Sequence, residues 1–140
     1  MAVKIPETLR KILEDKAYGH VITKNPSGSP QVSMVWVDAD GDDLVFNTND
    51  ARAKTLNLKR DPRVIVSVQN RNDPQAYAIF YGKVKSITND ANNAHIDKMA
   101  KRFLGLDKYQ SRIPGEQRVV VRIGVDKIGG FNQPGYQPWA

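Results

Sequence analysis

The chain has 140 residues, 40% of them hydrophobic, and carries a formal net charge of +6. This length predicts a single domain over residues 1–140 with one hydrophobic core. Because the chain contains no cysteine, disulfides, thiol nucleophiles and cysteine metal sites are excluded. Residues 1–70 hold 10 Lys and Arg against 9 Asp and Glu, and residues 71–140 hold 11 against 6. The dispersed excess comes with no nucleic-acid-binding motif, so we expect no nucleic-acid partner.

The N-terminal segment mixes charges of both signs and has no long apolar run. This rules against a signal peptide or a membrane span and predicts a cytoplasmic protein. Pro6 suits a first helical position, and Leu9, Ile12 and Leu13 form one apolar stripe. We therefore expect a short helix over about residues 6–16.

Residues 17–48 are predicted to form a three-stranded antiparallel meander. Strands over residues 17–24 and 31–38 flank a dense turn signal at 25–30, and a turn at 39–42 leads into the third strand. Four aspartates follow one another around that second turn. We interpret them as a solvated turn rather than a calcium loop, because Gly41 comes too early for such a loop.

A helix is predicted over residues 51–60, with Asn49 or Asp50 as its cap and Pro62 just beyond its end. Its first turn carries two cations, Arg52 and Lys54, at the positive end of the helix dipole. A cation there costs about 0.3–1 kcal/mol, whereas a bound phosphate would find free N–H groups and positive charge together. The alternative is a solvated turn that tolerates both charges.

The second half of the chain adds three more strands, over about residues 64–68, 76–87 and 119–125. The run 76–81 is apolar on both faces, which predicts a barrel interior on one side and a subunit contact on the other. Between the last two strands we expect a helix that starts at Asn89 or Asp90 and ends at Gly105. Six strands with few helices predict a mainly β fold, a small antiparallel barrel with flanking helices.

Several short segments carry a family resemblance through their order and spacing. They are residues 30–36 (PQVSMVW), 40–42 (DGD), 46–48 (FNT), 52–55 (RAKT), 57–58 (NL) and 60–63 (RDPR). Together they resemble the split β-barrel family of flavin- and deazaflavin-binding proteins that includes pyridoxamine 5′-phosphate oxidase. The likeness is greatest to the short branch that uses the deazaflavin coenzyme F-420. It is dense over residues 17–82, and it departs from the family at 71–75, where related members often carry an aromatic residue.

The resemblance implies a six-stranded antiparallel split β-barrel of the FMN-binding type, with a cofactor site between two subunits. The cofactor phosphate would lie against the loop and helix after the third strand, at Thr48, Arg52, Ala53, Lys54 and Thr55. The ring would lie against the second and third strands, at Val35, Trp36 and Asn47 together with Ser33 and Met34. Residues 69–77 of the partner subunit would complete the site. Without the resemblance, a tryptophan on a strand such as Trp36 would be interpreted as a core or interface residue.

The implied activity is that of a coenzyme F-420-dependent oxidoreductase, which passes a hydride to an organic acceptor such as a quinone, an enone or a conjugated pigment. One alternative is an FMN-dependent enzyme similar to pyridoxamine 5′-phosphate oxidase, and another is a carrier that binds the cofactor without turnover. No acid–base pair stands out, and the cofactor supplies the hydride chemistry.

His20 and His95 lack any ligand pattern, so we interpret both as structural and expect no metal. The C-terminal aromatics Phe131, Tyr136 and Trp139 either form a mobile tail or close over the cofactor.

Overall fold

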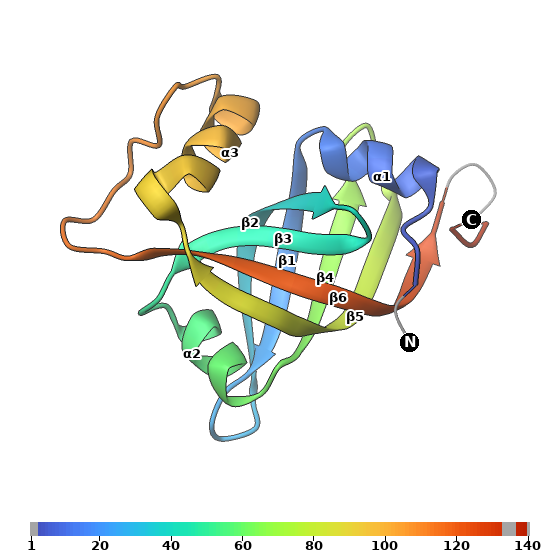
Figure 1. Ribbon diagram of the computed structural model, residues 1–140. Helices are drawn as coiled ribbons and strands as arrows, with labels where there is room; N and C mark the ends of the chain where they lie inside the picture. The colour runs from blue at the N-terminus through green and yellow to red at the C-terminus, as the bar shows by residue number, and fades with distance from the viewer. Residues whose placement is uncertain (1–2, 133–136, 140) are drawn as a thin grey trace.

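Six antiparallel strands form a closed barrel in the computed structural model, which describes residues 3–132 and 137–139 (Figure 1). Around the barrel the order is β1-β2-β3-β6-β5-β4, and pairing of β1 with β4 closes it. The strands are β1 Ala17–Lys24, β2 Pro30–Asp40, β3 Asp43–Asn49, β4 Arg63–Asn70, β5 Asp73–Asn89 and β6 Arg118–Phe131. The predicted mainly β fold with six antiparallel strands is confirmed, as is the meander of the first three.

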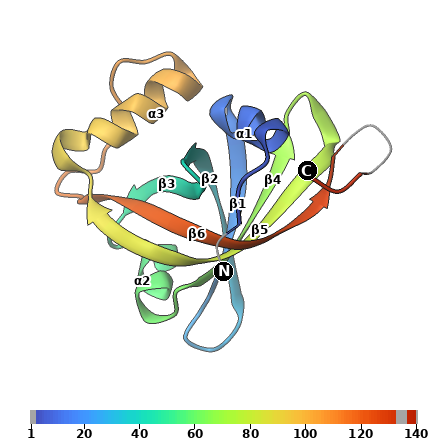
Figure 2. The ribbon, with the colours of Figure 1, turned by 45° about the vertical axis from the view of Figure 1, so that its right-hand side comes forward.

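Three helices flank the barrel: α1 Glu7–Glu14, α2 Ala53–Arg60 and α3 Ala94–Leu104, the last preceded by the 3-10 turn η1 Ala91–Asn93. Helix α1 covers one end of the barrel, α2 lies at the opposite end, and α3 stands outside the wall (Figures 1 and 2). Leu9 and Leu13 of α1 and Leu58 of α2 belong to the main core. Within the described residues, no helix is long and apolar enough to cross a membrane.

The long strand β5 has one face inside the barrel and one outside. Ala76, Ala78 and Phe80 are at most 1% exposed and point into the core, whereas Tyr81, on the other face, is 36% exposed. The strand pairs with both β4 and β6, as its length predicts. The interior half of the prediction for this strand is confirmed, and the subunit contact on its outer face stays a prediction.

The outer faces of β2, β1, β4 and β5 form a second apolar surface, which we call the outer sheet face. Cross-strand pairing brings its members together, since Ile22 is opposite both Val32 and Ile65, and Ile65 is opposite Tyr81. Val32 is 54% exposed and Met34 is 52% exposed, so this surface is open to solvent in the single chain.

Several predicted boundaries were wrong, and three of them have a clear local cause. Helix α2 begins at Ala53, with Arg52 as its N-cap and no side-chain cap, because Asn49 makes a tighter turn in which its Oδ1 accepts from the N–H of Ala51 (3.1 Å). Strand β5 begins at residue 73, directly after a tight hairpin that allows an early start. Strand β6 continues six residues beyond 125, to Phe131, because its glycines pair closely with β5.

The described part of the C-terminal tail packs beside the start of β5. The indole Nε1 of Trp139 donates to the carbonyl of Tyr77 (2.8 Å), and the Phe131 ring meets the Tyr77 ring edge-on at 6.3 Å. Tyr136 lies outside the described residues. Within a single chain, Phe131 and Trp139 are therefore docked on β5 and do not lie over the cavity described below.

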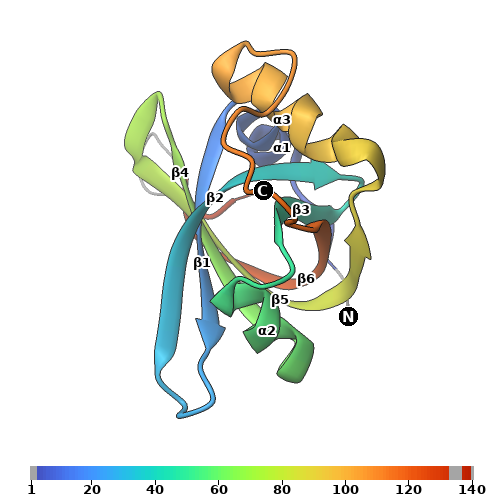
Figure 3. The same cartoon turned by 90° about the vertical axis from the view of Figure 1, so that its left-hand side faces the viewer.

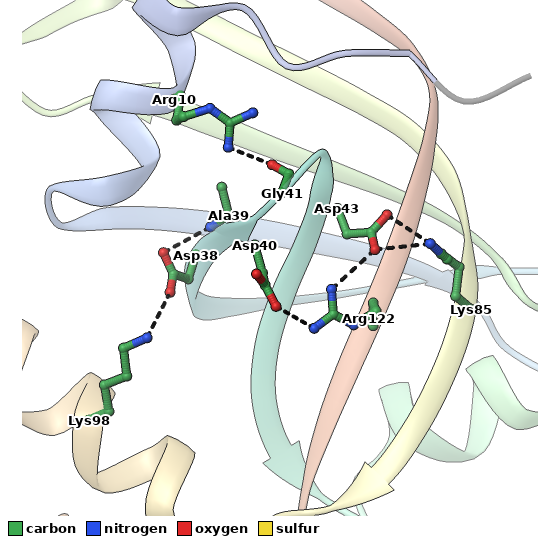
Figure 4. A network of polar contacts seen from close by, with 9 residues as sticks. All are labelled: Arg10, Asp38, Ala39, Asp40, Gly41, Asp43, Lys85, Lys98 and Arg122. Carbon is green, nitrogen blue, oxygen red and sulfur yellow. Dashed lines mark hydrogen bonds and ion pairs between the residues drawn. The ribbon is translucent and has the colours of Figure 1, made fainter.

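The hairpin between β2 and β3 is held by hydrogen bonds and ion pairs from four other elements, and Figure 4 draws those of Arg10, Lys85, Lys98 and Arg122. Asp38 makes an ion pair with Arg102 of α3 at 2.7 Å, and Asp42 makes one with Arg10 of α1 at 3.0 Å. Asp43 makes two ion pairs, with Lys85 of β5 at 3.0 Å and with Arg122 of β6 at 3.1 Å. The turn prediction is confirmed here, but its description as solvated is wrong for Asp38, which is only 6% exposed.

Candidate functional site

The barrel wall opens between β2 and β3. Strand β2 pairs with β3 only from Val37 to Asp40, so residues 30–36 pair with β1 alone. At the other side of the opening, β3 continues from Asn47 to Asn49 along β6 only. Two strand edges with unpaired backbone groups therefore face each other, with α2 below, α3 above and the loop 105–117 beside them (Figure 3).

A cavity of about 390 Å³ occupies this opening. Twelve residues line it: Ser33, Met34, Val35, Trp36, Asn47, Thr48, Arg52, Lys54, Ile96, Met99, Tyr109 and Arg118. Eight of the ten residues predicted for the cofactor site are among them. The structure thus brings together residues from two strands and one helix start that the sequence separates by up to 21 positions.

Ala53 and Thr55 are the two predicted residues outside the lining. Ala53 is exposed in the first turn of α2, and Thr55 is fully buried. The hydroxyl of Thr55 donates to the carbonyl of Asn49 at 2.7 Å, so this side chain holds the loop in place. Glu116 holds the loop from the other side, because its Oε2 accepts from Asn49 Nδ2 at 3.0 Å.

Positive charge gathers in the cavity without matching carboxylates. Arg52, Lys54 and Arg118 line it, and only Arg118 makes an ion pair there, with Glu116 at 3.5 Å. Among the described residues no carboxylate lies within ion-pair distance of Arg52 or Lys54. The positive end of α2 adds to this charge, since its first turn has no acidic residue and no side-chain cap. The site is therefore suited to an anion.

Lys54 shows the electrostatic cost of this arrangement. Its side chain is nearly buried, with 9% of the residue exposed. Burial lowers the pKa of the Lys54 ammonium below its ordinary value, and the charges of Arg52 and Arg118 lower it further. An anion bound among these three cations would offset both effects.

An aromatic wall forms another side of the cavity. The Trp36 indole stacks on Phe103 of α3 with ring centroids 4.9 Å apart and planes 11° apart. Tyr109, from the loop after α3, meets Trp36 edge-on at 6.0 Å, and the Arg118 guanidinium lies over the Tyr109 ring at 5.2 Å. Trp36 thus anchors α3 to β2 and at the same time lines the cavity.

Polar groups in the cavity wall include one without a partner. The Ser33 Oγ is buried and has no hydrogen-bond partner among the described residues. Buried hydroxyls are usually hydrogen-bonded, so an unpaired one in a cavity wall suits contact with a ligand or a bound water.

Sequence reasoning missed the contributions of α3, the loop 105–117 and β6. Arg118 is held by Asn47, whose Oδ1 accepts from Arg118 Nε at 2.9 Å although the two residues are 71 positions apart. Ile96, Met99 and Tyr109 join the cavity only because α3 folds back over β2. The helical stripe containing Ile96 and Met99 was visible in the sequence, but nothing local indicated that its surroundings included a cavity.

A larger cavity of about 500 Å³ lies on the outer sheet face, with Ile22, Ile65 and Tyr81 among its lining residues. Its charges are already matched in part, since Arg63 makes an ion pair with Asp61 at 2.7 Å. The smaller cavity combines unmatched cations, open strand edges and an unpaired hydroxyl, and it is therefore the candidate site.

The fold and the site define a class: a split β-barrel with a cationic cavity at the split. A family model described as pyridoxamine 5′-phosphate oxidase matches residues 5–130. The chain belongs to the pyridoxamine 5′-phosphate oxidase family, which confirms the resemblance read from residues 30–63.

Solved structures agree with this membership. An F420 reductase is 31% identical, with a TM-score of 0.77, and the match covers 89% of this chain and 98% of that one. A putative pyridoxamine 5′-phosphate oxidase from Listeria innocua is 21% identical, with a TM-score of 0.67 and coverage of 88% and 94%. General stress protein 26 from Bacillus anthracis is 21% identical, with a TM-score of 0.65 and coverage of 87% and 89%. The two structures at 21% identity show a shared fold. The match to the F420 reductase agrees with a position of this chain near the F-420 branch of the family.

Replacing Lys54 by Met should leave the ligand-free protein as stable as the wild type or more stable at pH 7. The folded state holds the Lys54 pKa below the unfolded value of 10.5, so the charged form opposes folding. Wild-type stability should rise with pH between the folded and unfolded pKa values, and the difference between Lys54→Met and wild type should shrink over that range.

Denaturant unfolding at pH 7 and at about pH 10 measures this difference. Lys59→Met is the matched control, because Lys59 is an exposed residue in the last turn of the same helix, where a cation is favourable. A Lys54→Met protein that is clearly less stable than wild type at pH 7 would contradict the electrostatic argument.

Proposed function

We propose that this protein is a coenzyme F-420-dependent oxidoreductase, which passes a hydride from the reduced deazaflavin to an organic acceptor. The observation that carries the proposal is the cavity at the barrel split, where Arg52, Lys54 and Arg118 converge. Among the described residues, Glu116 is the only carboxylate within ion-pair distance of any of these three cations. The 31% identity to an F420 reductase over nearly the whole chain supports the choice of cofactor.

The residues fit a ribityl phosphate and a flat ring system. The phosphate is assigned to the start of α2, where the side chains of Thr48, Arg52 and Lys54 line the cavity. Ala53 and Thr55 contribute through the backbone N–H groups of the first turn, which no side chain caps. The ring is assigned to the opening between the strands, against Met34, Val35, Trp36 and Asn47, with the unpaired Ser33 hydroxyl as a polar contact.

The bound deazaflavin supplies the hydride, and the chain supplies binding, orientation and exclusion of water. The stacked Trp36 and Phe103 give the cavity a rigid wall, and Tyr109 lines the cavity beside Trp36. Hydride transfer requires the reacting atoms to be about 3–3.5 Å apart, which such a wall helps to maintain. Quinones, enones and conjugated pigments are the proposed acceptors.

FMN is the alternative cofactor, because it presents the same ribityl phosphate and the family includes pyridoxamine 5′-phosphate oxidase. F-420 also carries an acidic tail, which the basic excess in residues 71–140 favours. The cytoplasmic location predicted from the sequence stays a prediction.

Titration of the purified protein with F-420 and, separately, with FMN tests the cofactor assignment. We expect tighter binding of F-420, and we expect Arg52→Met and Lys54→Met each to weaken that binding about ten- to a hundredfold. A charge-assisted hydrogen bond contributes about 1.5–3 kcal/mol, which sets this range. Lys59→Met should bind as the wild type does. Unchanged affinity in both cavity variants would place the phosphate elsewhere.

An oxidation assay separates an enzyme from a carrier. Reduced F-420 bound to an enzyme should lose its electrons to an added quinone or enone faster than free reduced F-420 does. A carrier would instead shield the ring and slow the same reaction. The readout is recovery of the absorbance of oxidised F-420 over time, with and without protein, across a panel of acceptors. Protection against every acceptor would favour the carrier.

We also propose a homodimer in which the outer sheet face of one copy contacts that of the other. Val32, Met34 and Tyr81 of this face are exposed in the single chain, and Ile22 and Ile65 are half-buried. Ile22 adjoins Ile65, and Ile65 adjoins Tyr81, across three strands. In such a dimer the cofactor sites would lie at the interface, and residues 69–77 of one copy would complete the site of the other.

Ile79→Glu should split the dimer and weaken cofactor binding together. Ile79 belongs to the outer face of β5, where its neighbour across the strand pair is Ser67, whereas Phe80 is inside the core. An unpaired charge in an apolar contact costs several kcal/mol. The control is Thr88→Glu, an exposed position near the far end of the same strand. Light scattering at micromolar concentration gives the mass, and a monomeric wild-type protein would rule out the dimer.

A further inference from the structure

A hydrogen-bonded network lies behind the cavity wall and joins β3, α3 and β6. The network consists of Asp90, His95, Asn47 and Arg118. The Nδ2 of Asn47 donates to Asp90 Oδ2 at 3.0 Å and to His95 Nδ1 at 2.9 Å, and its Oδ1 accepts from Arg118 Nε at 2.9 Å. Asn47 and Arg118 line the cavity, whereas Asp90 and His95 do not.

Asp90 is the fixed end of this network. Its carboxylate is 6% exposed and accepts from the backbone N–H groups of His95 (2.8 Å) and Ile96 (2.9 Å) in the first turn of α3. Its own N–H donates to the carbonyl of Arg118 at 2.9 Å. The carboxylate is therefore held by three donors, of which Asn47 is the third.

The chemistry of these partners allows the Asn47 amide only one orientation. A guanidinium can only donate hydrogen bonds and a carboxylate can only accept them. Asn47 must therefore present its oxygen to Arg118 and its NH2 group to Asp90. The second amide hydrogen is directed at His95 Nδ1, which must then be an acceptor. It follows that His95 is neutral and carries its proton on Nε2.

We propose that Asp90 and His95 are positioning residues for the cofactor site, which act by orienting Asn47 so that Asn47 holds the Arg118 guanidinium at the cavity. This inference rests on the proposed function in taking the ligand to be an anionic cofactor. Arg118 then shares the binding of that anion with Arg52 and Lys54. Arg118 Nη1 makes the ion pair with Glu116 at 3.5 Å, whereas Nη2 donates no hydrogen bond to a described residue and is available to a ligand.

Protonation of His95 breaks this arrangement. The imidazolium has donors at both nitrogens, so Nδ1–H would face the Asn47 NH2 group. Rotating the amide does not help, because the NH2 group would then face Arg118 and the oxygen would face Asp90. Every orientation leaves at least one clash between like groups, so the hold on Arg118 is weakened.

The charged groups around His95 act in both directions. Asp90, at the start of α3, and Asp38, on β2, favour the imidazolium, whereas Lys98 and Arg102, on α3, oppose it. Burial has the largest effect, and it lowers the pKa of His95 below the ordinary 6.5. The neutral form therefore predominates at pH 7, and cofactor affinity should be lost as the pH falls through this lowered pKa.

Cofactor titrations on a set of variants test the network. Arg118→Met should weaken F-420 binding about ten- to a hundredfold, and Asn47→Leu should lose most of the same factor. The double variant should bind within about twofold of Arg118→Met, because the two residues act as one unit. Additive losses would overturn the proposal.

A second set of titrations follows affinity for F-420 between about pH 5 and 8. His95→Leu should bind more weakly at pH 7, and His95→Asn should restore most of that loss, because Asn places an oxygen near the position of Nδ1 without a titrating group. Wild-type affinity should fall on the acid side, and that of His95→Asn should stay nearly level. Parallel pH profiles for the two proteins would overturn the role of His95.

Nitrogen NMR of the ligand-free protein separates the network from the proposed function. The wild-type spectrum should show His95 as the neutral Nε2–H tautomer at pH 7, and the Arg118 Nε–H signal should move as His95 titrates. In Asn47→Leu that coupling should disappear. A mixed tautomer, or an Arg118 signal indifferent to His95, would overturn the proposal. If the wild type bound neither F-420 nor FMN, the proposed function would fail, and this spectrum alone would decide whether the network orients Arg118.

Discussion

The pairing between β2 and β3 determines what this barrel can do. Four residues of β2, Val37 to Asp40, pair with β3, and the preceding seven pair only with β1. A longer pairing would seal the wall and leave a packed barrel without a site. The short pairing is held by the ion pairs of the hairpin, where cations from α1, α3, β5 and β6 converge on the carboxylates. The same hairpin therefore anchors the strands at one end and lets them separate at the other.

The two charged regions of the molecule follow opposite rules. At the hairpin each carboxylate meets a cation, and the hydrogen bond from Arg122 holds the pKa of Asp40 below its usual value. In the cavity, by contrast, Lys54 is buried beside two other cations, and its pKa is lowered instead. The first arrangement stabilises the fold, and the second destabilises it until an anion binds. Such local conflicts with stability are expected where a protein has a ligand to bind.

Short-range patterns in the sequence predicted the strands, the barrel and the two cations at the start of α2. They did not predict what depends on distant partners, such as Arg118, whose hydrogen-bond acceptor is 71 positions away. The glycines near residue 130 led to a predicted end of β6 that was too early. Gly130 has a φ of +87°, and a Cβ there would lie 2.2 Å from the Tyr77 carbonyl, so the close pairing of β6 with β5 requires glycine.

At α3, Asp90 was correctly expected near the helix start. The helix itself begins later, because Asn92 and Asn93 adopt left-handed conformations (φ 57° and 56°).

That late start of α3 has a consequence for the cavity. The extra turn formed by Asn92 and Asn93 lets the Asp90 carboxylate reach forward to the N–H groups of His95 and Ile96 while it still faces Asn47 on β3. An ordinary cap would satisfy the helix and leave Asn47 without its acceptor. Left-handed residues other than glycine are uncommon and cost free energy, and they persist where the surrounding contacts compensate. Here the compensating contacts are those of one buried carboxylate that serves both the helix start and the cavity wall, so the position of α3 and the orientation of Asn47 are set together.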